Sequence, residues 1–311
     1  MGPSIEAVGL SKSYGSFKAL SDLDFKIGGA KCVGFLGPNG AGKTTTMKLF
    51  TGLISPTKGK ALINGVDVRE DKRKALGYSA SLIETPEIYP ALTPAEALMM
   101  LCEIRGVPKE ERRKRISESL ARVKMEEWEG KKVGSFSKGM KQRVAIASTL
   151  ISDPDVIILD EPTTGLDPRG MSEVREIVKS LSDRLVFMSS HLLAEVTEVC
   201  QEVALVDHGK LLVHDTLAGV TSKFRAAGAT VEVGFSRSVD DSTLSRVKVL
   251  EGVVDASLKD PTRMTVKLSG GAGSQEKLFE QVAGLKAGAT SFTETSGGLE
   301  EAYLSLIKET V

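Results

Sequence analysis

Residues 37–44 read Gly37-Pro38-Asn39-Gly40-Ala41-Gly42-Lys43-Thr44, which fits the pattern G-x-x-x-x-G-K-[ST]. The apolar run Lys31–Leu36 precedes this stretch and a helix-competent segment follows it, so we expect a strand, a loop and a helix in that order. Glycines let backbone N–H groups turn towards phosphate oxygens, and the helix N-terminus adds a positive dipole end. The Lys43 ammonium would then reach the β- and γ-phosphates, and the Thr44 hydroxyl could ligate Mg²⁺. The stretch therefore predicts a loop that binds nucleotide phosphates.

A second strand-like run ends in two acidic residues. Val156–Leu159 is continuously apolar, and Asp160 and Glu161 follow it. We expect Asp160 to hold Mg²⁺ and Glu161 to orient or deprotonate a water that attacks the γ-phosphate. An acidic turn after a strand is only moderately specific by itself, but together with the phosphate loop it is a strong signal.

Short apolar runs also occur at residues 185–188 and 203–206. Such runs are typical of strands that are buried on both faces of a parallel sheet. The sequence Thr93-Pro94-Ala95-Glu96 predicts the start of an intervening helix, because it combines a capping Thr, a Pro at the first helical position and a Glu three residues after the cap. Residues 1–222 are therefore expected to form an α/β domain.

The pattern changes after about Lys223. Residues 229–235, 263–268 and 289–293 alternate apolar and polar side chains, as strands with one solvated face do. With a further strand at 253–258 and helices at 243–249, 275–285 and 299–308, the order of elements is that of the split βαβ, or ferredoxin-like, arrangement. We therefore expect a small α+β accessory domain over residues 223–311.

Charge and composition exclude some classes of protein. The 311 residues include 41 Lys and Arg and 41 Asp and Glu, a balance that argues against binding to nucleic acid or anionic lipid through bulk charge. Cys32, Cys102 and Cys200 are too few and too scattered for a disulfide framework or a zinc site, which favours a reducing compartment. No apolar run reaches the roughly 18 residues of a membrane helix. Any function at a membrane would therefore require another chain to span it.

Residues 136–143 read Phe136-Ser137-Lys138-Gly139-Met140-Lys141-Gln142-Arg143 and resemble the signature motif of ABC (ATP-binding cassette) ATPases, usually written L-S-G-G-Q. Ser137 and Gly139 match this motif, whereas Phe136, Lys138 and Met140 differ from its commonest letters. The resemblance implies a P-loop NTPase fold that binds ATP and Mg²⁺, with a helical subdomain at about residues 85–150. It also implies that the helix N-terminus at residues 137–140 binds the γ-phosphate of ATP held by a second cassette.

Other segments are similar to the same family, and the resemblance as a whole extends over about residues 4 to 222. Residues 162–168 resemble the D-loop, which makes Asp167 a candidate nucleotide-binding residue. Ser189-Ser190-His191 resembles the H-switch, in which His191 would touch the γ-phosphate. Tyr14 matches the aromatic residue that stacks on adenine, and the resemblance extends the ATP-binding loop to Thr45.

One position departs from the family pattern. The family normally has a Gln that contacts Mg²⁺ and senses the membrane partner, and this sequence has Glu84 there. A carboxylate can still ligate Mg²⁺, although it adds negative charge near the γ-phosphate.

The resemblance implies the ATP-hydrolysing subunit of an exporter-type ABC transporter, similar to ABC-2 and antibiotic-resistance pumps. Such a subunit lies in the cytoplasm against the inner face of the membrane, binds a separate polytopic permease, and forms a homodimer or a heterodimer of cassettes. No nucleic-acid partner is expected. The alternative is a soluble ABC ATPase that acts on DNA or on the ribosome. DNA-acting members insert a long coiled coil before the signature and this sequence has no sustained heptads, while ribosome-binding members carry two cassettes and this sequence has one.

Overall fold

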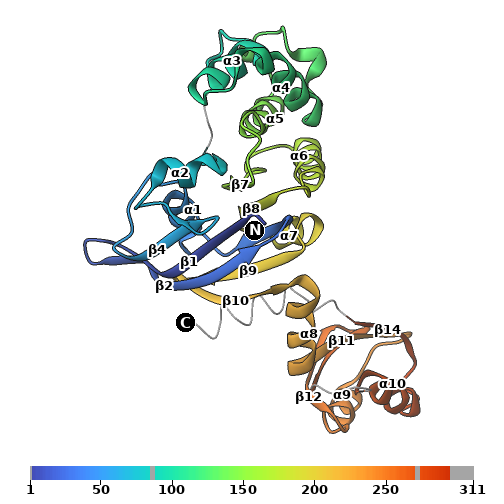
Figure 1. The fold of residues 1–311 in the computed structure, drawn as a ribbon. Coiled ribbons are helices and arrows are strands. Elements are labelled where there is room, and N and C mark those ends of the chain that lie inside the picture. Colours follow the sequence, from blue (N-terminus) through green and yellow to red (C-terminus); the bar gives the residue numbers. More distant parts are fainter. Residues whose placement is uncertain (1, 85–87, 270–273, 295–311) are drawn as a thin grey trace. The chain divides into compact units, whose positions relative to one another are not determined.

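The computed structural model describes residues 2–84, 88–269 and 274–294 (Figure 1). The chain divides into two units, Met1–His214 and Asp215–Val311. The boundary expected at residue 222 falls a little later, inside helix α8 (Leu217–Ala227). Each unit has its own hydrophobic core.

The first unit contains two sheets. A four-stranded sheet has the order β2-β1-β4-β5, and its neighbouring strands are antiparallel. A six-stranded sheet has the order β10-β9-β3-β8-β7-β6, in which β3 pairs in parallel with β8 and β9, and β7 with β8 and β6. The expected parallel sheet is therefore present. The strands are β1 (Ser4–Tyr14), β2 (Phe17–Gly28), β3 (Lys31–Leu36), β4 (Lys58–Ile63), β5 (Val66–Asp67), β6 (Ser79–Leu82), β7 (Val156–Leu159), β8 (Leu185–Ser190), β9 (Glu202–Asp207) and β10 (Lys210–Thr216).

Helix α1 (Lys43–Phe50) follows β3 and shares one core with both sheets. Its buried apolar residues include Met47, Leu49 and Phe50, which are at most 1% exposed. The Phe187 ring of β8 lies 6.1 Å from the Phe50 ring and 5.8 Å from the Phe25 ring of β2. Phe187 therefore contacts both the helix and the other sheet. These aromatic contacts hold α1 in place relative to the two sheets.

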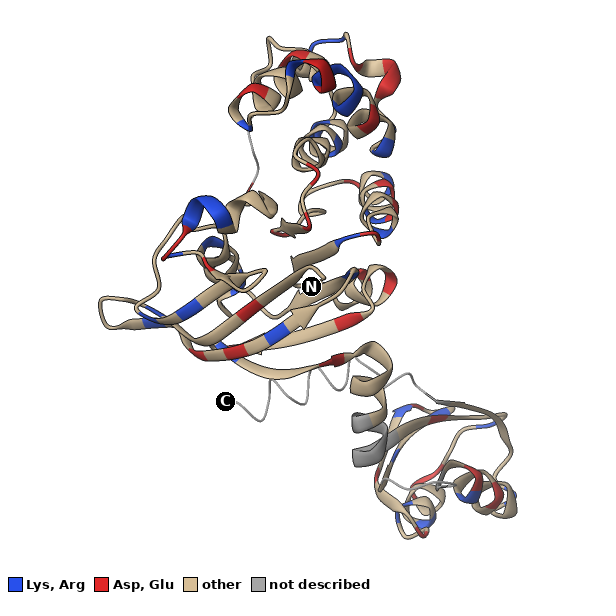
Figure 2. Ribbon diagram, viewed as in Figure 1, with Lys and Arg blue, Asp and Glu red and all other residues tan. Residues whose placement is uncertain are grey.

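Three helices, α3 (Pro94–Ile104), α4 (Lys109–Arg122) and α5 (Lys138–Leu150), form a helical group beside the six-stranded sheet (Figure 1). The expected capping box is present, because the Thr93 hydroxyl accepts a hydrogen bond from Glu96 N and the Glu96 carboxylate accepts one from Thr93 N. Figure 2 shows charges of both signs on these helices, and Arg112 and Arg115 of α4 pair with Glu103 and Glu111. The first unit also contains α2 (Lys72–Gly77), α6 (Pro168–Ser180), α7 (Leu193–Val199) and short 3₁₀ turns at Glu126–Trp128 and Val133–Ser135.

The second unit contains an antiparallel sheet of order β12-β13-β11-β14. In chain order β11 is the first of these strands. The second strand, β12, lies at an edge of the sheet, and the third, β13, lies beside β11, as in the expected ferredoxin-like arrangement. Val233, Met264 and Leu278 belong to its core. The expected helix at 299–308 lies outside the described residues. The elements are β11 (Gly228–Phe235), α9 (Asp241–Lys248), β12 (Val253–Asp260), β13 (Arg263–Ser269), α10 (Ser274–Gly284) and β14 (Ala289–Glu294).

The composition of the chain led to expectations about membrane-spanning helices and about the cysteines. In the described part of the chain, no helix has the length and apolarity needed to cross a membrane. The cysteines are scattered in the sequence, but the fold brings Cys32 and Cys200 together as buried free thiols whose Sγ atoms lie 3.3 Å apart.

The core around α1 predicts a large effect of Phe187→Ala. Removing this fully buried ring leaves a cavity between the sheets, so the free energy of unfolding of the first unit should fall by about 3–5 kcal/mol. Denaturant unfolding followed by circular dichroism measures this change. Phe17→Ala is the control, because Phe17 is 63% exposed and should change stability by less than about 0.5 kcal/mol. Equal effects of the two substitutions would contradict this account of the core.

Candidate functional site

The carboxyl ends of three adjacent parallel strands carry the candidate site. The order β3-β8-β7 places the loop at residues 37–44 after β3, Asp160 and Glu161 after β7, and His191 after β8 between them. In open α/β sheets ligands bind in the crevice outside this edge. Residues far apart in the sequence are thereby brought to one place.

The phosphate loop has a backbone that only glycine accommodates easily. Gly40 and Gly42 have φ values of 86° and 101°, in the left-handed region. A Cβ atom on Gly37 would lie 2.3 Å from the Val206 carbonyl oxygen. Gly42 caps α1 without a side-chain hydrogen bond, so no side chain occupies the N–H groups that open the helix. This cradle of backbone donors, with Thr44 and Thr45 half-buried in the first turn, fits a phosphate group.

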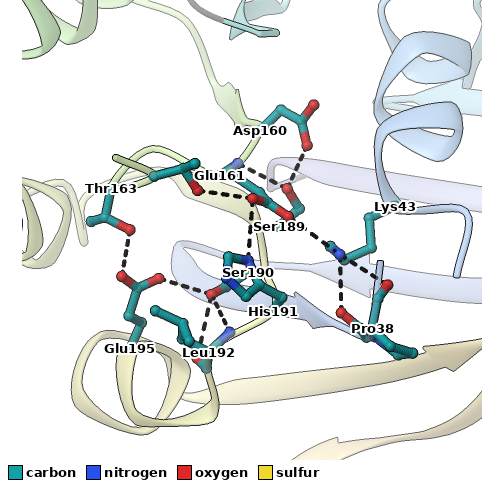
Figure 3. A network of polar contacts seen from close by, with 12 residues as sticks. Pro38, Lys43, Asp160, Glu161, Thr163, Ser189, Ser190, His191, Leu192 and Glu195 are labelled. Carbon is teal, nitrogen blue, oxygen red and sulfur yellow. Dashed lines mark hydrogen bonds and ion pairs between the residues drawn. The ribbon is translucent and has the colours of Figure 1, made fainter. Parts of the chain in front are cut away.

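Lys43 is almost completely buried beneath the loop, with 6% of its surface exposed. Its Nζ donates hydrogen bonds to the carbonyl oxygens of Gly37 at 2.9 Å and Pro38 at 3.1 Å. The same atom lies 3.3 Å from Glu161 Oε1 (Figure 3). The ammonium therefore joins the loop after β3 to the acid after β7.

Glu161 lies at the centre of a polar network (Figure 3). Its Oε2 accepts a hydrogen bond from Thr164 Oγ1 at 2.8 Å and lies 3.2 Å from His191 Nδ1. Burial alone would raise the pKa of Glu161, but the Thr164 hydrogen bond and the charge of Lys43 outweigh burial and hold that pKa below its usual 4.5. Glu161 is therefore ionised near neutral pH and can accept a proton.

Asp160 is held by Ser189, a residue that no sequence motif marked as part of the site. Ser189 Oγ donates to Asp160 Oδ1 at 2.5 Å and accepts a hydrogen bond from Glu161 N at 2.9 Å. Ser189 thus fixes the side chain of one acid and the backbone of the other. The only sequence signal for this role is its position at the end of the strand that precedes His191.

The oxygen atoms of Thr44 and Asp160 are the candidate ligands for a cation. No group of three His, Cys, Asp or Glu that could hold a metal ion occurs among the described residues. This sparse set suits Mg²⁺, which in nucleotide sites takes one or two carboxylates and completes its shell with phosphate oxygens and water.

Glu84 occupies an exposed turn with φ 61°, and its side chain is 67% exposed. Its Oε1 accepts a hydrogen bond from Lys48 Nζ of α1 at 2.6 Å. This hydrogen bond raises the pKa of Lys48. The Glu84 carboxylate is therefore paired with a cation of the helix that follows the phosphate loop, a pairing that the sequence does not predict.

The remaining predicted site residues lie on other elements. Tyr14 ends β1 and is 49% exposed, and Lys12 Nζ lies 5.0 Å from its ring centroid. Ser137 caps α5 by accepting a hydrogen bond from Met140 N at 3.2 Å. Asp167 caps α6 in the same way through Gly170 N at 2.9 Å.

The signature segment also touches the loop that follows Glu161. A Cβ atom on Gly165 would lie 2.2 Å from Lys138 Nζ, so the Lys138 ammonium packs directly against this loop. Within the described part of this chain, residues 137–140 form no hydrogen bond with Lys43, Glu161 or His191. One chain therefore brings together the phosphate loop, the two acids and His191, and presents its signature segment elsewhere.

Comparisons with known proteins agree with this arrangement. Residues 20–164 match the family model described as "ABC transporter". This match includes the phosphate loop, Glu84, the signature segment, Asp160 and Glu161, and ends before Asp167 and His191.

Individual relatives and a solved structure are also similar. The bacitracin transport ATP-binding protein BcrA of Bacillus licheniformis is 40% identical over 67% of this chain and 68% of its own length. The linearmycin resistance ATP-binding protein LnrL of Bacillus subtilis is 29% identical over 99% of both chains. A solved structure described as the ATP-binding subunit of an ABC transporter has a TM-score of 0.64 and 30% identity, and the match covers 71% of this chain and 92% of that chain. The chain therefore belongs to the ABC transporter family, as an ATP-binding and ATP-hydrolysing subunit.

Proposed function

We propose that hydrolysis of ATP at the Lys43–Glu161–His191 cluster drives export through a separate polytopic permease. The observation that carries the chemical part of this proposal is the continuous set of contacts from the phosphate loop through Lys43 and Glu161 to His191. The names of BcrA and LnrL, which refer to bacitracin transport and linearmycin resistance, support a cargo of the antibiotic class. None of the relatives named above is described as acting on nucleic acid or ribosomes, so we do not propose that alternative.

Each residue of the cluster has a distinct proposed role. Glu161, ionised near neutral pH, orients the attacking water and accepts its proton. His191 contacts the Glu161 carboxylate and also faces the γ-phosphate. Lys43 offsets negative charge on the β- and γ-phosphates. Thr44 and Asp160, with Glu84 as a further candidate, would hold Mg²⁺, which would offset the negative charge of the phosphates.

We further propose that two cassettes pair head to tail. The N-terminus of α5 at residues 137–140 would bind the γ-phosphate of ATP held by the second cassette, and Asp167 would lie at the same interface. Tyr14 would stack on the adenine of the chain's own ATP. The partner cassette is a second copy of this chain or a different cassette.

The proposed permease contact lies at the start of the helical group. Tyr89 is 70% exposed, and Ile88 and Leu92 are partly exposed beside it in the sequence. Such a patch suits a short cytoplasmic helix of the permease, which would hold the subunit against the inner face of the membrane.

Glu161→Gln tests the hydrolytic role and the dimer together. The amide cannot accept the proton of water, so steady-state hydrolysis should fall by about 100-fold or more while ATP still binds through the intact loop. With ATP and Mg²⁺ this variant should elute as a dimer in size-exclusion chromatography. Glu176→Gln, at an exposed ion pair on α6, is the control and should retain the wild-type rate. Undiminished hydrolysis in Glu161→Gln would refute the role assigned to Glu161.

Thr164→Val tests the cause of the low pKa of Glu161. Glu161 acts in its ionised form, so activity is lost as pH falls through its pKa. Because the Thr164 hydrogen bond lowers that pKa, its removal should move the acid limb of the pH–rate profile to higher pH. Thr197→Val, on the exposed face of α7, should leave the profile in place. An acid limb that does not move in Thr164→Val would contradict the assignment.

Glu84→Gln tests the residue at the position where the family normally has Gln. Loss of the carboxylate removes the ion pair with Lys48 and one candidate oxygen ligand, so the Mg²⁺ concentration that gives half-maximal hydrolysis should change. Glu70→Gln, which removes another exposed Lys–Glu ion pair on the same unit, is the control. If the Mg²⁺ dependence of Glu84→Gln equals that of wild type, Glu84 is not a ligand or sensor.

A further inference from the structure

Glu195 is a buried carboxylate that lies outside every motif used above. It belongs to α7 and is only 3% exposed. It accepts a hydrogen bond from Thr163 Oγ1 through Oε1, and one from Ser190 Oγ through Oε2 at 2.8 Å (Figure 3). Thr163 belongs to the loop after β7 and Ser190 to the end of β8, so Glu195 joins two segments of the site.

The environment of Glu195 differs from that of a structural ion pair. In the part of the chain that the structure describes, Glu195 forms no ion pair, and its two oxygens are satisfied by hydroxyl groups. Burying a carboxylate without a cation is costly, and ordinary packing would be served as well by an apolar side chain of similar size. What the carboxylate adds is the ability to accept hydrogen bonds from two separate segments at once.

The two segments that Glu195 joins are those that hold Glu161. Thr163 is adjacent in sequence to Thr164, which donates to Glu161 Oε2. Ser190 is adjacent to His191, whose Nδ1 lies 3.2 Å from the same oxygen. Ser190 Oγ also accepts a hydrogen bond from Leu192 N at 2.9 Å, which fixes the peptide on both sides of His191.

We propose that Glu195 is a positioning residue that sets the relative placement of Thr164 and His191 around Glu161. This inference rests on the proposed role of Glu161 in hydrolysis. Because Glu195 does not contact the phosphate loop or Lys43, its loss should impair the chemical step and leave ATP binding almost unchanged. A purely structural role would lower thermal stability without this selective loss of turnover.

The test compares Glu195→Gln, Thr163→Val and their double variant in the full chain. Glutamine keeps the size of the side chain but has one acceptor oxygen, and valine keeps the shape of threonine but lacks the hydroxyl. Each single variant should lower kcat by about 10- to 100-fold, with KM for ATP within about twofold of wild type. The double variant should be no slower than the slower single variant, because both remove the same link.

Two further variants control for fold and shape. Glu198 lies on the same helix and forms an exposed ion pair with Arg175. The variant Glu198→Gln should leave kcat and KM unchanged. Thr163→Ser retains the hydroxyl and should restore most of the activity lost in Thr163→Val. If Glu195→Gln does not fold, Thr163→Val and Thr163→Ser alone decide the outcome. Wild-type kcat in Thr163→Val, or equal losses in Thr163→Val and Thr163→Ser, would overturn the proposal.

A spectroscopic measurement separates this inference from the proposed role of Glu161. The measurement is the NMR spectrum of the histidine rings. The chain has three histidines, so the ring signal of His191 can be assigned by comparison with a His191 variant. In nucleotide-free protein, Glu195→Gln and Thr163→Val should shift the His191 signal, while His208 and His214 keep theirs and Glu198→Gln shifts none of them. An unmoved His191 signal would refute the positioning role of Glu195. Full activity in Glu161→Gln would instead refute the proposed function.

Discussion

The burial of the Lys43 ammonium is the constraint on which the site depends. A buried cation must be paired and hydrogen-bonded, and Lys43 meets this requirement with two carbonyl oxygens of its own loop and with Glu161 from a different strand. The loop after β3 and the acid after β7 must therefore keep a fixed separation. Strand β8 lies between β3 and β7 and sets that separation through its pairing with both.

Strand β8 also contributes the side chains that hold the acids in place. Its last residues and the one that follows, Ser189, Ser190 and His191, contact Asp160, Glu195 and Glu161 respectively. Buried polar side chains need hydrogen-bond partners. The three polar residues at the end of this buried strand find them in carboxylates from the loop after β7 and from helix α7. The core supports this arrangement from below, since Phe187 of β8 packs against Phe50 of the helix that begins at Lys43.

The sequence was sufficient to predict what depends on local pattern. Continuous apolar runs predicted the parallel strands, and the glycines of residues 37–44 predicted the loop, in which Gly40 and Gly42 have left-handed φ values that favour glycine. The resemblance to ABC ATPases is confirmed by the comparisons. The contacts of Ser189 and Glu195, and the pairing of Lys48 with Glu84, could not be predicted in this way. They join residues that are 29, 32 and 36 positions apart, and no sequence periodicity encodes which hydroxyl or cation meets which carboxylate.

The net charge of the chain is zero, but acidic side chains outnumber basic ones at the candidate site. Asp160 and Glu161 both carry carboxylates towards the edge where a triphosphate would lie, and Lys43 is already shared with Glu161. Like charges at short range in a partly buried site repel strongly, so binding a polyanion there requires compensation beyond one ammonium. The N-terminal N–H groups of α1 supply part of it, and a divalent cation held by Asp160 and Thr44 would supply the rest. Glu195 serves a different purpose from the two acids, because both of its oxygens accept hydrogen bonds from the hydroxyl groups of Thr163 and Ser190.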